Sequence, residues 1–150
     1  MKFLLVLAAG LICQPAFASG GLNCSAEGEG VSFDVGGGVT HGMGSPLFSF
    51  TGHLSVSGEG IAADLGITEF SRDHVTQYWL DGKDLRLLPY RERTGDAPHG
   101  HVALTLRAEA LGDKALYTGR YALTVFDMSD DNGGESVTVS RASDTECLVE

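Results

Sequence analysis

The sequence predicts a single all-β domain, an antiparallel β-sandwich or barrel of about 8–10 strands whose termini are joined by a disulfide. Apolar residues recur at every second position along most of the chain. Turn-forming residues separate these stretches at regular intervals, and two cysteines lie near opposite ends of residues 19–150. No linker and no internal repeat divides this segment, so we expect one domain there.

The alternation identifies individual strands, because successive side chains of a strand point to opposite faces of its sheet. The apolar series are Val31, Phe33 and Val35; Phe48, Phe50, Leu54 and Val56; Ile61, Ala63, Leu65 and Ile67; Val102, Leu104, Leu106 and Ala108; Tyr117, Tyr121, Leu123 and Val125; and Val137 with Val139. Turn signals stand at residues 57–60, 81–82, 112–113 and 131–134. Alternation alone does not separate a sandwich from a barrel.

Residues 71–90 allow two interpretations. Ser71 could cap a short helix over residues 74–80, but the β-branched and aromatic residues there favour a strand, which residues 85–90 would pair with as a hairpin. We therefore expect a hairpin. In it, Tyr78 and Leu80 share one face with Leu85 and Leu87, and Trp79 shares the other face with Arg86, Leu88 and Tyr90.

The first 18 residues have the layout of a cleaved secretory signal. Lys2 precedes an apolar run over residues 3–12 that is too short for a permanent membrane anchor, and Ala16 and Ala18 provide the small residues of a cleavage site after Ala18. Ile12 stands where a lipoprotein signal carries a small residue, so we do not expect lipidation of Cys13. The sequence thus predicts a periplasmic or secreted protein without membrane insertion after cleavage.

Removal of the signal leaves two cysteines, Cys24 and Cys147, in a compartment that permits disulfides. Only one intramolecular pairing is open to them. Closing so long a loop would stabilise the fold by roughly 4–5 kcal/mol in the chain-entropy description. We therefore expect the bond to hold the first and last strands side by side.

The charge of the chain is strongly uneven. The formal net charge is −10 at pH 7, and no Lys or Arg occurs between Ser19 and Ser71. Nucleic acid and anionic lipid surfaces would be repelled by such a chain. We accordingly expect neither as a partner, although solubility alone accounts for acidity in most exported proteins.

A candidate binding patch lies on the hairpin. Aromatic and arginine side chains together are typical of interface anchors. The residues are Trp79, Arg86, Leu88, Tyr90, Arg91 and Arg93. Large aromatic residues more often pack in cores, so burial of Trp79 at one end of the core is the favoured expectation for that residue, with an exposed patch as the alternative.

Histidines and methionines supply a second candidate, a copper or zinc site. The residues are His41, Met43, His53, His99 and His101. His99 and His101 stand two positions apart, which puts both imidazoles on one side of an extended chain. Residues 127–135 resemble a calcium loop but carry Asn132 where glycine is required and Thr138 where the twelfth-position glutamate is required, so an acidic hairpin loop is expected, with weak calcium binding left open.

No catalytic motif is present: the sequence has no Gly-x-Ser-x-Gly elbow, no phosphate-binding glycine loop and no thiol left after disulfide formation. We therefore expect a non-enzymatic, exported binding protein of the bacterial envelope, without a cofactor, that engages a protein or glycan. The alternatives are a periplasmic copper or zinc protein and, if the fold is a barrel with an apolar lumen, a carrier of a small apolar ligand.

Overall fold

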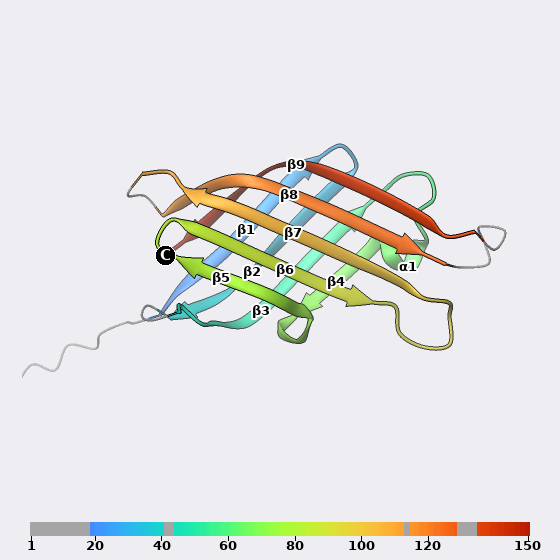
Figure 1. The fold of residues 1–150 in the computed structure, drawn as a ribbon, viewed down its shortest axis with the longest axis horizontal. Coiled ribbons are helices and arrows are strands. Elements are labelled where there is room, and N and C mark those ends of the chain that lie inside the picture. Colours follow the sequence, from blue (N-terminus) through green and yellow to red (C-terminus); the bar gives the residue numbers. More distant parts are fainter. Residues whose placement is uncertain (1–18, 41–43, 113–114, 129–134) are drawn as a thin grey trace, which may run out of the picture.

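The computed structural model describes residues 19–40, 44–112, 115–128 and 135–150. In this part of the chain nine antiparallel strands form one nearly closed, barrel-like sheet (Figure 1), which confirms the all-β prediction and resolves it in favour of a barrel. The strands are β1 (Ser19–Gly28), β2 (Val31–Thr40), β3 (Leu47–Val56), β4 (Ile67–Ser71), β5 (Val75–Asp81), β6 (Asp84–Glu92), β7 (Gly100–Ala110), β8 (Leu116–Asp127) and β9 (Val137–Val149). A helical turn, α1 (Ala63–Gly66), and a 3-10 turn (Arg72–His74) complete the described elements.

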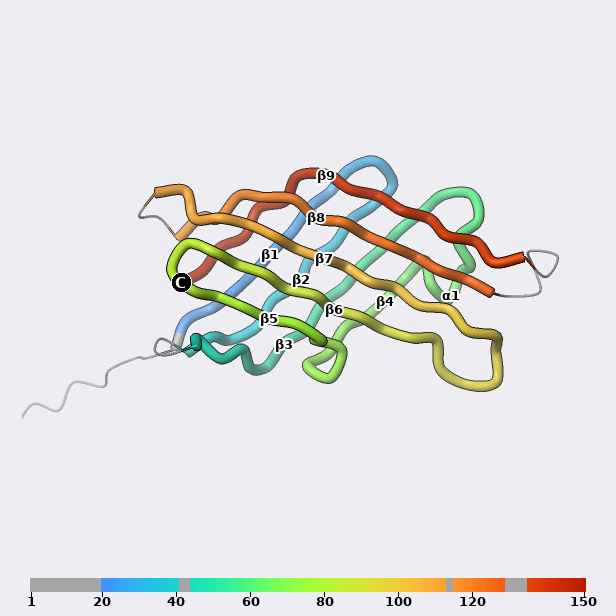
Figure 2. Tube along the Cα trace, viewed as in Figure 1, coloured from blue at the N-terminus to red at the C-terminus, as the bar shows by residue number. Residues whose placement is uncertain are grey.

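The sheet consists of two walls. Its strand order is β4-β3-β2-β1-β9-β8-β7-β6-β5, so β1–β4 form a first wall and β5–β9 a second wall. In Figure 2 the first wall lies behind the second, and its strands cross those of the second wall at a steep angle. The chain thus builds the first wall, crosses to the far edge of the second, and returns strand by strand until β9 reaches β1.

The barrel interior is filled with side chains. Most of the apolar residues that alternate in the sequence occupy inward positions, and Phe33 of the first wall contacts Tyr121 of the second edge-to-face, with ring centroids 5.1 Å apart. Phe48 is an exception to the predicted series: it is 42% exposed, because the backbone departs from regular alternation at Ser49, whose φ is 51°. Among the most completely buried residues are Leu54, Leu85, Leu87, Leu104, Leu106 and Leu123. A barrel of about this strand number has an interior that side chains can fill.

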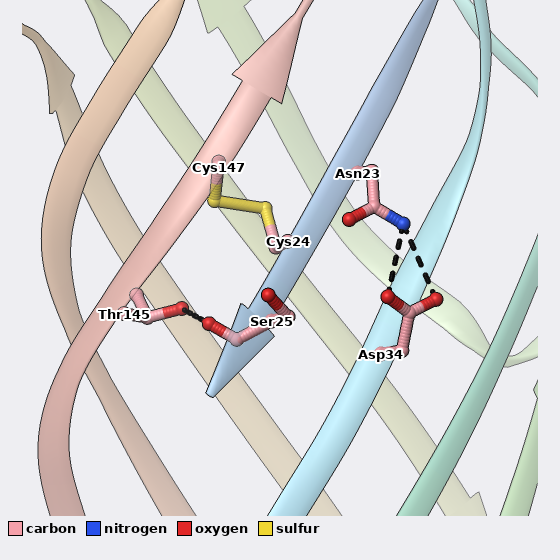
Figure 3. The surroundings of a disulfide bond; sticks show 6 residues. All are labelled: Asn23, Cys24, Ser25, Asp34, Thr145 and Cys147. Atoms are coloured by element: carbon pink, nitrogen blue, oxygen red, sulfur yellow. Dashed lines mark hydrogen bonds between the residues drawn. A yellow bond between two sulfur atoms is a disulfide. The ribbon is translucent and has the colours of Figure 1, made fainter. Parts of the chain in front are cut away.

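The two walls meet along two lines, which we call seams. The first seam lies between β1 and β9, and the predicted disulfide links these two strands. Strands β1 and β9 pair over four residue pairs, whereas β8 and β9 pair over twelve. Cys24 and Cys147 face each other in this short pairing and are bonded, and Thr145 Oγ1 donates a hydrogen bond to the Ser25 carbonyl across the same seam at 2.9 Å (Figure 3). The disulfide indicates an oxidising, non-cytoplasmic compartment.

The second seam has no strand pairing within the described residues. Strands β4 and β5 are the two ends of the sheet order, and side chains bridge the opening between them. Arg91 donates to the Glu69 carbonyl at 2.9 Å, and the Tyr78 hydroxyl donates to the Ser45 carbonyl at 2.9 Å. Burial, together with nearby Tyr117, raises the pKa of Tyr78 to about 12.

The predicted hairpin is confirmed. The alternative, a short helix over residues 74–80, is not formed, and the only helical structure described there is the 3-10 turn. Ser71 and His74 form a capping box around the 3-10 turn, after which residues 75–81 are a strand. The strand expected over residues 61–67 is wrong. Leu65 and Gly66 both donate to the Ala62 carbonyl and close the turn α1, because Gly58 and Gly60, with φ of 149° and 79°, redirect the chain just before it.

The first strand was expected only from the disulfide at Cys24 and without bounds, because residues 19–28 are mostly small or polar and show no clear alternation. No helix among the described residues has the length and apolarity to cross a membrane.

Candidate functional site

The face of the β5–β6 hairpin that carries Trp79 points outward. Trp79 pairs with Arg86 and Tyr78 with Leu87, in the register expected from the sequence. The inward positions are occupied by Tyr78, Leu80 and their partners, so Trp79 points away from the core and is 54% exposed. The expectation that Trp79 packs in the core is therefore wrong, and the alternative, an exposed tryptophan beside Arg86, is what the structure has.

Two of the candidate patch residues lie on the opposite face. Arg91 pairs with buried Val102, and the Arg93 N–H donates to the carbonyl of buried Gly100. Both arginines therefore occupy positions whose side chains point toward the inside of the barrel, because side chains alternate between the two faces of a strand. Trp79, Arg86, Leu88 and Tyr90 remain together on the outer face. The outer patch is thus smaller along β6 than the sequence suggested.

Arg93 instead closes one end of the barrel. Its side chain is 6% exposed and binds Asp64 of α1 through Nε at 2.6 Å and Asp127 of β8 through Nη1 at 2.8 Å. Its hydrogen bonds to Asp64 and then to Asp127 raise the pKa of Arg93, and the same hydrogen bond to Arg93 lowers the pKa of Asp64. Three separate elements are therefore held together by a single guanidinium. Asp127, the first residue of the calcium-loop resemblance, turns inward to this contact.

A row of arginines continues from Trp79 across the second wall. Arg86 is opposite Arg107, and Arg107 is opposite Arg120. We call Trp79, Arg86, Arg107 and Arg120 the Trp–Arg row; it crosses β5, β6, β7 and β8, a span of about 14–15 Å at the usual strand spacing. Shallow depressions follow it, one lined by Gln77, Trp79, Asp84 and Arg86 and the next by Asp84, Arg86, Arg107 and Arg120.

The two outer arginines of the row are partly neutralised by carboxylates, and within the described residues the middle arginine is not. Arg86 forms an ion pair with Asp84 at 2.9 Å and Arg120 one with Asp144 at 3.3 Å, and all four side chains are at least 40% exposed. No described residue forms an ion pair with Arg107. Beyond the row, toward the β5–β6 turn, lie Asp81, Asp84 and Glu109 in register. An anionic ligand would therefore contact the row from its other side.

Gly119 brings β8 close enough to β7 for this arrangement. A Cβ atom at Gly119 would lie 2.0 Å from the Arg107 carbonyl oxygen and 2.5 Å from the Ala108 Cα atom. Only glycine permits so close an approach of the two backbones. The residue that follows, Arg120, is thereby placed directly across from Arg107.

On the other side of the row, the outer face of the second wall has no charged side chain for two outward positions of each strand from β6 to β8. The positions between the row and the far end of the strands carry short or apolar side chains, which we call the floor: Leu88, Ala103, Thr105, Ala122 and Thr124. Thr105 is opposite Ala122 and Ala103 is opposite Thr124. The floor thus covers two successive outward positions of the second wall, and no charged side chain stands on it.

An aromatic cluster borders the floor at its far end. It consists of Tyr90, His99, His101 and Phe126, with the His101 ring stacked on Phe126 at 5.3 Å and tilted against Tyr90 at 5.1 Å. His101 Nδ1 and His99 Nε2 are 3.3 Å apart. Burial, and then the nearby His99, lower the pKa of His101, while burial, followed by the hydrogen bond to Glu92, raises that of Tyr90.

The other candidate metal ligands are not brought to this cluster. His53 is exposed on β3 of the first wall, between Asp34 and Glu69 of the neighbouring strands. His41 and Met43 lie outside the described residues, as do residues 129–134 of the acidic loop. In the described ranges no group of three His, Cys, Asp or Glu residues is placed to hold a metal ion.

No protein-family model matches the sequence, and neither a curated protein nor a solved structure matches it significantly. The functional argument therefore depends on the geometry of the chain itself.

Sequence reasoning missed the Trp–Arg row because a row runs across strands and depends on their register. Each of the arginines does alternate with buried residues, Arg107 between Leu106 and Ala108 for example, so their outward direction could have been predicted. Their alignment could not, since it needs the β6–β7 and β7–β8 pairings to be fixed.

Proposed function

We propose that this protein is an exported, non-catalytic binding protein whose second wall binds a glycan that carries carboxylate groups. The observation that supports this proposal is the Trp–Arg row, in which an exposed tryptophan and three directly opposed arginines lie along one edge of the floor. Guanidinium groups form bidentate hydrogen bonds with carboxylates. The Trp79 indole offers an apolar face against which a sugar ring can pack.

The composition of the chain makes the row notable. The whole sequence contains 10 Lys and Arg residues against 20 Asp and Glu residues, and three of the arginines stand opposite one another on adjacent strands. Like charges at directly opposed positions destabilise a sheet. Folding therefore gives no reason for the alignment, whereas an anionic ligand that lies across the strands does.

The shape of the site favours a glycan over the other occupants considered. The barrel interior is packed with leucine side chains, which disfavours a small apolar ligand in the lumen. Protein interfaces have an apolar centre with a polar rim, whereas here the floor consists of alanine and threonine apart from Leu88, and the tryptophan and arginines lie along its edge. A polysaccharide chain, flat and rich in hydroxyl groups, fits such an open surface.

An extracytoplasmic location agrees with this function. The Cys24–Cys147 disulfide requires an oxidising compartment, and the amino-terminal 18 residues have the pattern of a secretory signal. We propose the periplasm or the external medium of a bacterium as the place where the protein meets its glycan.

The test is binding of the oxidised protein to polygalacturonate, alginate and hyaluronan by isothermal titration calorimetry, with dextran as the neutral polymer and poly-L-glutamate as the acidic peptide. We expect binding to at least one carboxylated polysaccharide, weakened by salt because the contact is ionic and exposed. Arg107→Ala should weaken binding about tenfold or more, as loss of a charge-assisted hydrogen bond does, and Trp79→Ala should weaken it too.

Lys83→Ala is the matched control, since Lys83 is exposed in the β5–β6 turn, outside the row. It removes the same charge from the same wall and should leave the affinity unchanged. The proposal would be overturned by binding to none of the carboxylated polysaccharides, by binding to poly-L-glutamate alone, or by equal losses in the Arg107 and Lys83 variants.

A further inference from the structure

Beyond the glycan surface, we infer that His99, His101 and Met128 form a binding site for one monovalent copper ion at the far end of the second wall. The site combines two imidazole nitrogens with a thioether, and soft ligands of this kind select Cu(I). It is separate from the Trp–Arg row, which lies six residues away along β6 and β7, about 20 Å at the usual rise per residue.

The two imidazoles already have the separation of ligands to one ion. His99 Nε2 and His101 Nδ1 are 3.3 Å apart. Two nitrogens bound at the usual 2.0–2.1 Å with a tetrahedral angle between them would be about 3.3–3.4 Å apart. The nitrogen–nitrogen distance therefore already fits two ligands of one ion, and rotation of the rings would turn both lone pairs toward it.

Aromatic contacts hold the rings in this position. Phe126 stacks on His101 with an interplanar angle of 23° and lies 5.7 Å from His99, centroid to centroid. Tyr90 packs against His101 from the neighbouring strand, and its hydroxyl donates to Glu92 at 2.7 Å. Such supporting contacts reduce the ordering that ion binding would otherwise require.

Met128 supplies the third ligand. Its backbone N–H donates to the His99 carbonyl at 2.9 Å, which continues the β7–β8 pairing by one residue beyond Gly100 and Asp127. Directly opposed residues of an antiparallel pair project from the same face with Cβ atoms about 4.5–5.5 Å apart. Met128 is 49% exposed, so its thioether can turn toward the imidazoles without leaving a core position.

Binding needs only a rearrangement of protons. In the protein without metal, the N–H of one of the two facing nitrogens donates a hydrogen bond to the other nitrogen. With the ion bound, both facing nitrogens use their lone pairs, and that proton moves to the opposite nitrogen of its own ring. No electron is transferred, because the ion is supplied in its reduced state.

The experiment is an anaerobic competition for Cu(I), kept reduced by ascorbate, between the full chain and bathocuproine disulfonate. We expect one ion per chain. A combined His99→Asn and His101→Asn variant should lose on the order of 100-fold in Cu(I) affinity, and Met128→Leu should lose about tenfold. His53→Asn, an exposed histidine on the first wall, is the matched control and should bind as the wild type does.

Two further readouts keep the result unambiguous. Met128→Leu alters an exposed residue, so its fold is not at risk, and its affinity for Zn²⁺ should equal that of the wild type. Nitrogen chemical shifts of the histidine rings should move for His99 and His101 alone, since Cu(I) is diamagnetic. The inference is overturned if the double histidine variant keeps wild-type affinity, if Met128→Leu binds Cu(I) as the wild type does, or if loss of binding follows His41→Asn and Met43→Leu instead.

Discussion

The two walls of the barrel have similar inner faces and opposite outer faces. Both line the core with valine, leucine and aromatic residues at alternate positions. Outside, β1–β4 contain no Lys or Arg at all, whereas β5–β8 contain the Trp–Arg row and the aromatic cluster. Because the inner faces are sufficient to bury the core, the contrast between the outer faces is not required by the fold. It points instead to an outer surface of the second wall that serves binding.

The two seams between the walls differ as well. The β1–β9 seam has backbone pairing and a disulfide, and the opening between β4 and β5 is bridged by side chains. Stability should therefore depend on the inner lining and the seams, and binding on the outer face of the second wall. Substitutions in the two places should separate these properties.

The largest loss of stability should come from Arg93→Met. The substitution leaves the Asp127 carboxylate buried without this guanidinium and releases Asp64 from β6. We expect the free energy of unfolding to fall by about 3–5 kcal/mol, as it does when one partner of a buried ion pair is removed. Urea denaturation followed by circular dichroism measures this loss. Adding Asp127→Leu should restore part of the lost free energy of unfolding, because it removes the buried carboxylate. A double variant less stable than Arg93→Met would count against this explanation.

Removal of the disulfide should have the next largest effect. Combined Cys24→Ser and Cys147→Ser substitutions open a link between residues 123 positions apart at the shorter seam. The expected loss is about 2–5 kcal/mol of unfolding free energy. Urea midpoints of oxidised and reduced wild type provide the matched comparison. Equal midpoints would show that the four residue pairs of β1 and β9 hold the seam unaided.

Tyr78→Phe tests the side-chain seam, with a smaller expected effect. It removes the hydrogen bond to the Ser45 carbonyl, for which the typical net value is about 0.5–1.5 kcal/mol. Because the folded pKa, about 12, lies above the ordinary value of 10.0, the wild type should lose stability as the pH rises between these values. The Phe variant should lack this part of the loss. Chemical denaturation at pH 8 and pH 11 measures it, and equal pH dependence in both proteins would contradict the assignment.

The smallest effects on stability should come from the proposed binding surface. Arg107→Ala and Trp79→Ala change exposed side chains and should alter the free energy of unfolding by no more than about 0.5 kcal/mol. Arg107→Ala should also remove the repulsion between Arg107 and the two arginines opposite it, which offsets any loss of stability. Thermal unfolding of both variants measures this. A loss comparable to that of Arg93→Met would show that the row is structural.

The fold was largely predictable from local information. The alternation at Val31–Val35 and Val102–Ala108 and the turn at Asp81 and Gly82 each follow from nearby residues. The site was less predictable, because it depends on register between strands distant in sequence. Trp79 was expected inside, since both faces of its hairpin carry apolar residues and alternation alone does not tell which face turns toward the core. Arg93 was assigned to the surface, because its partners Asp64 and Asp127 are distant in the sequence and no local pattern predicts the contacts.

The central claim, that the outer face of the second wall binds a carboxylated glycan, is tested most directly by nuclear magnetic resonance. Oligogalacturonate would be titrated into the ¹⁵N-labelled, oxidised protein. We predict shifts at the Trp79 indole N–H, at the backbone amides of Arg86, Arg107 and Arg120, and along the floor at Ala103 and Thr105. Strands β2 and β3 should be unaffected. Shifts confined to the first wall, or no shifts at millimolar ligand, would contradict the account.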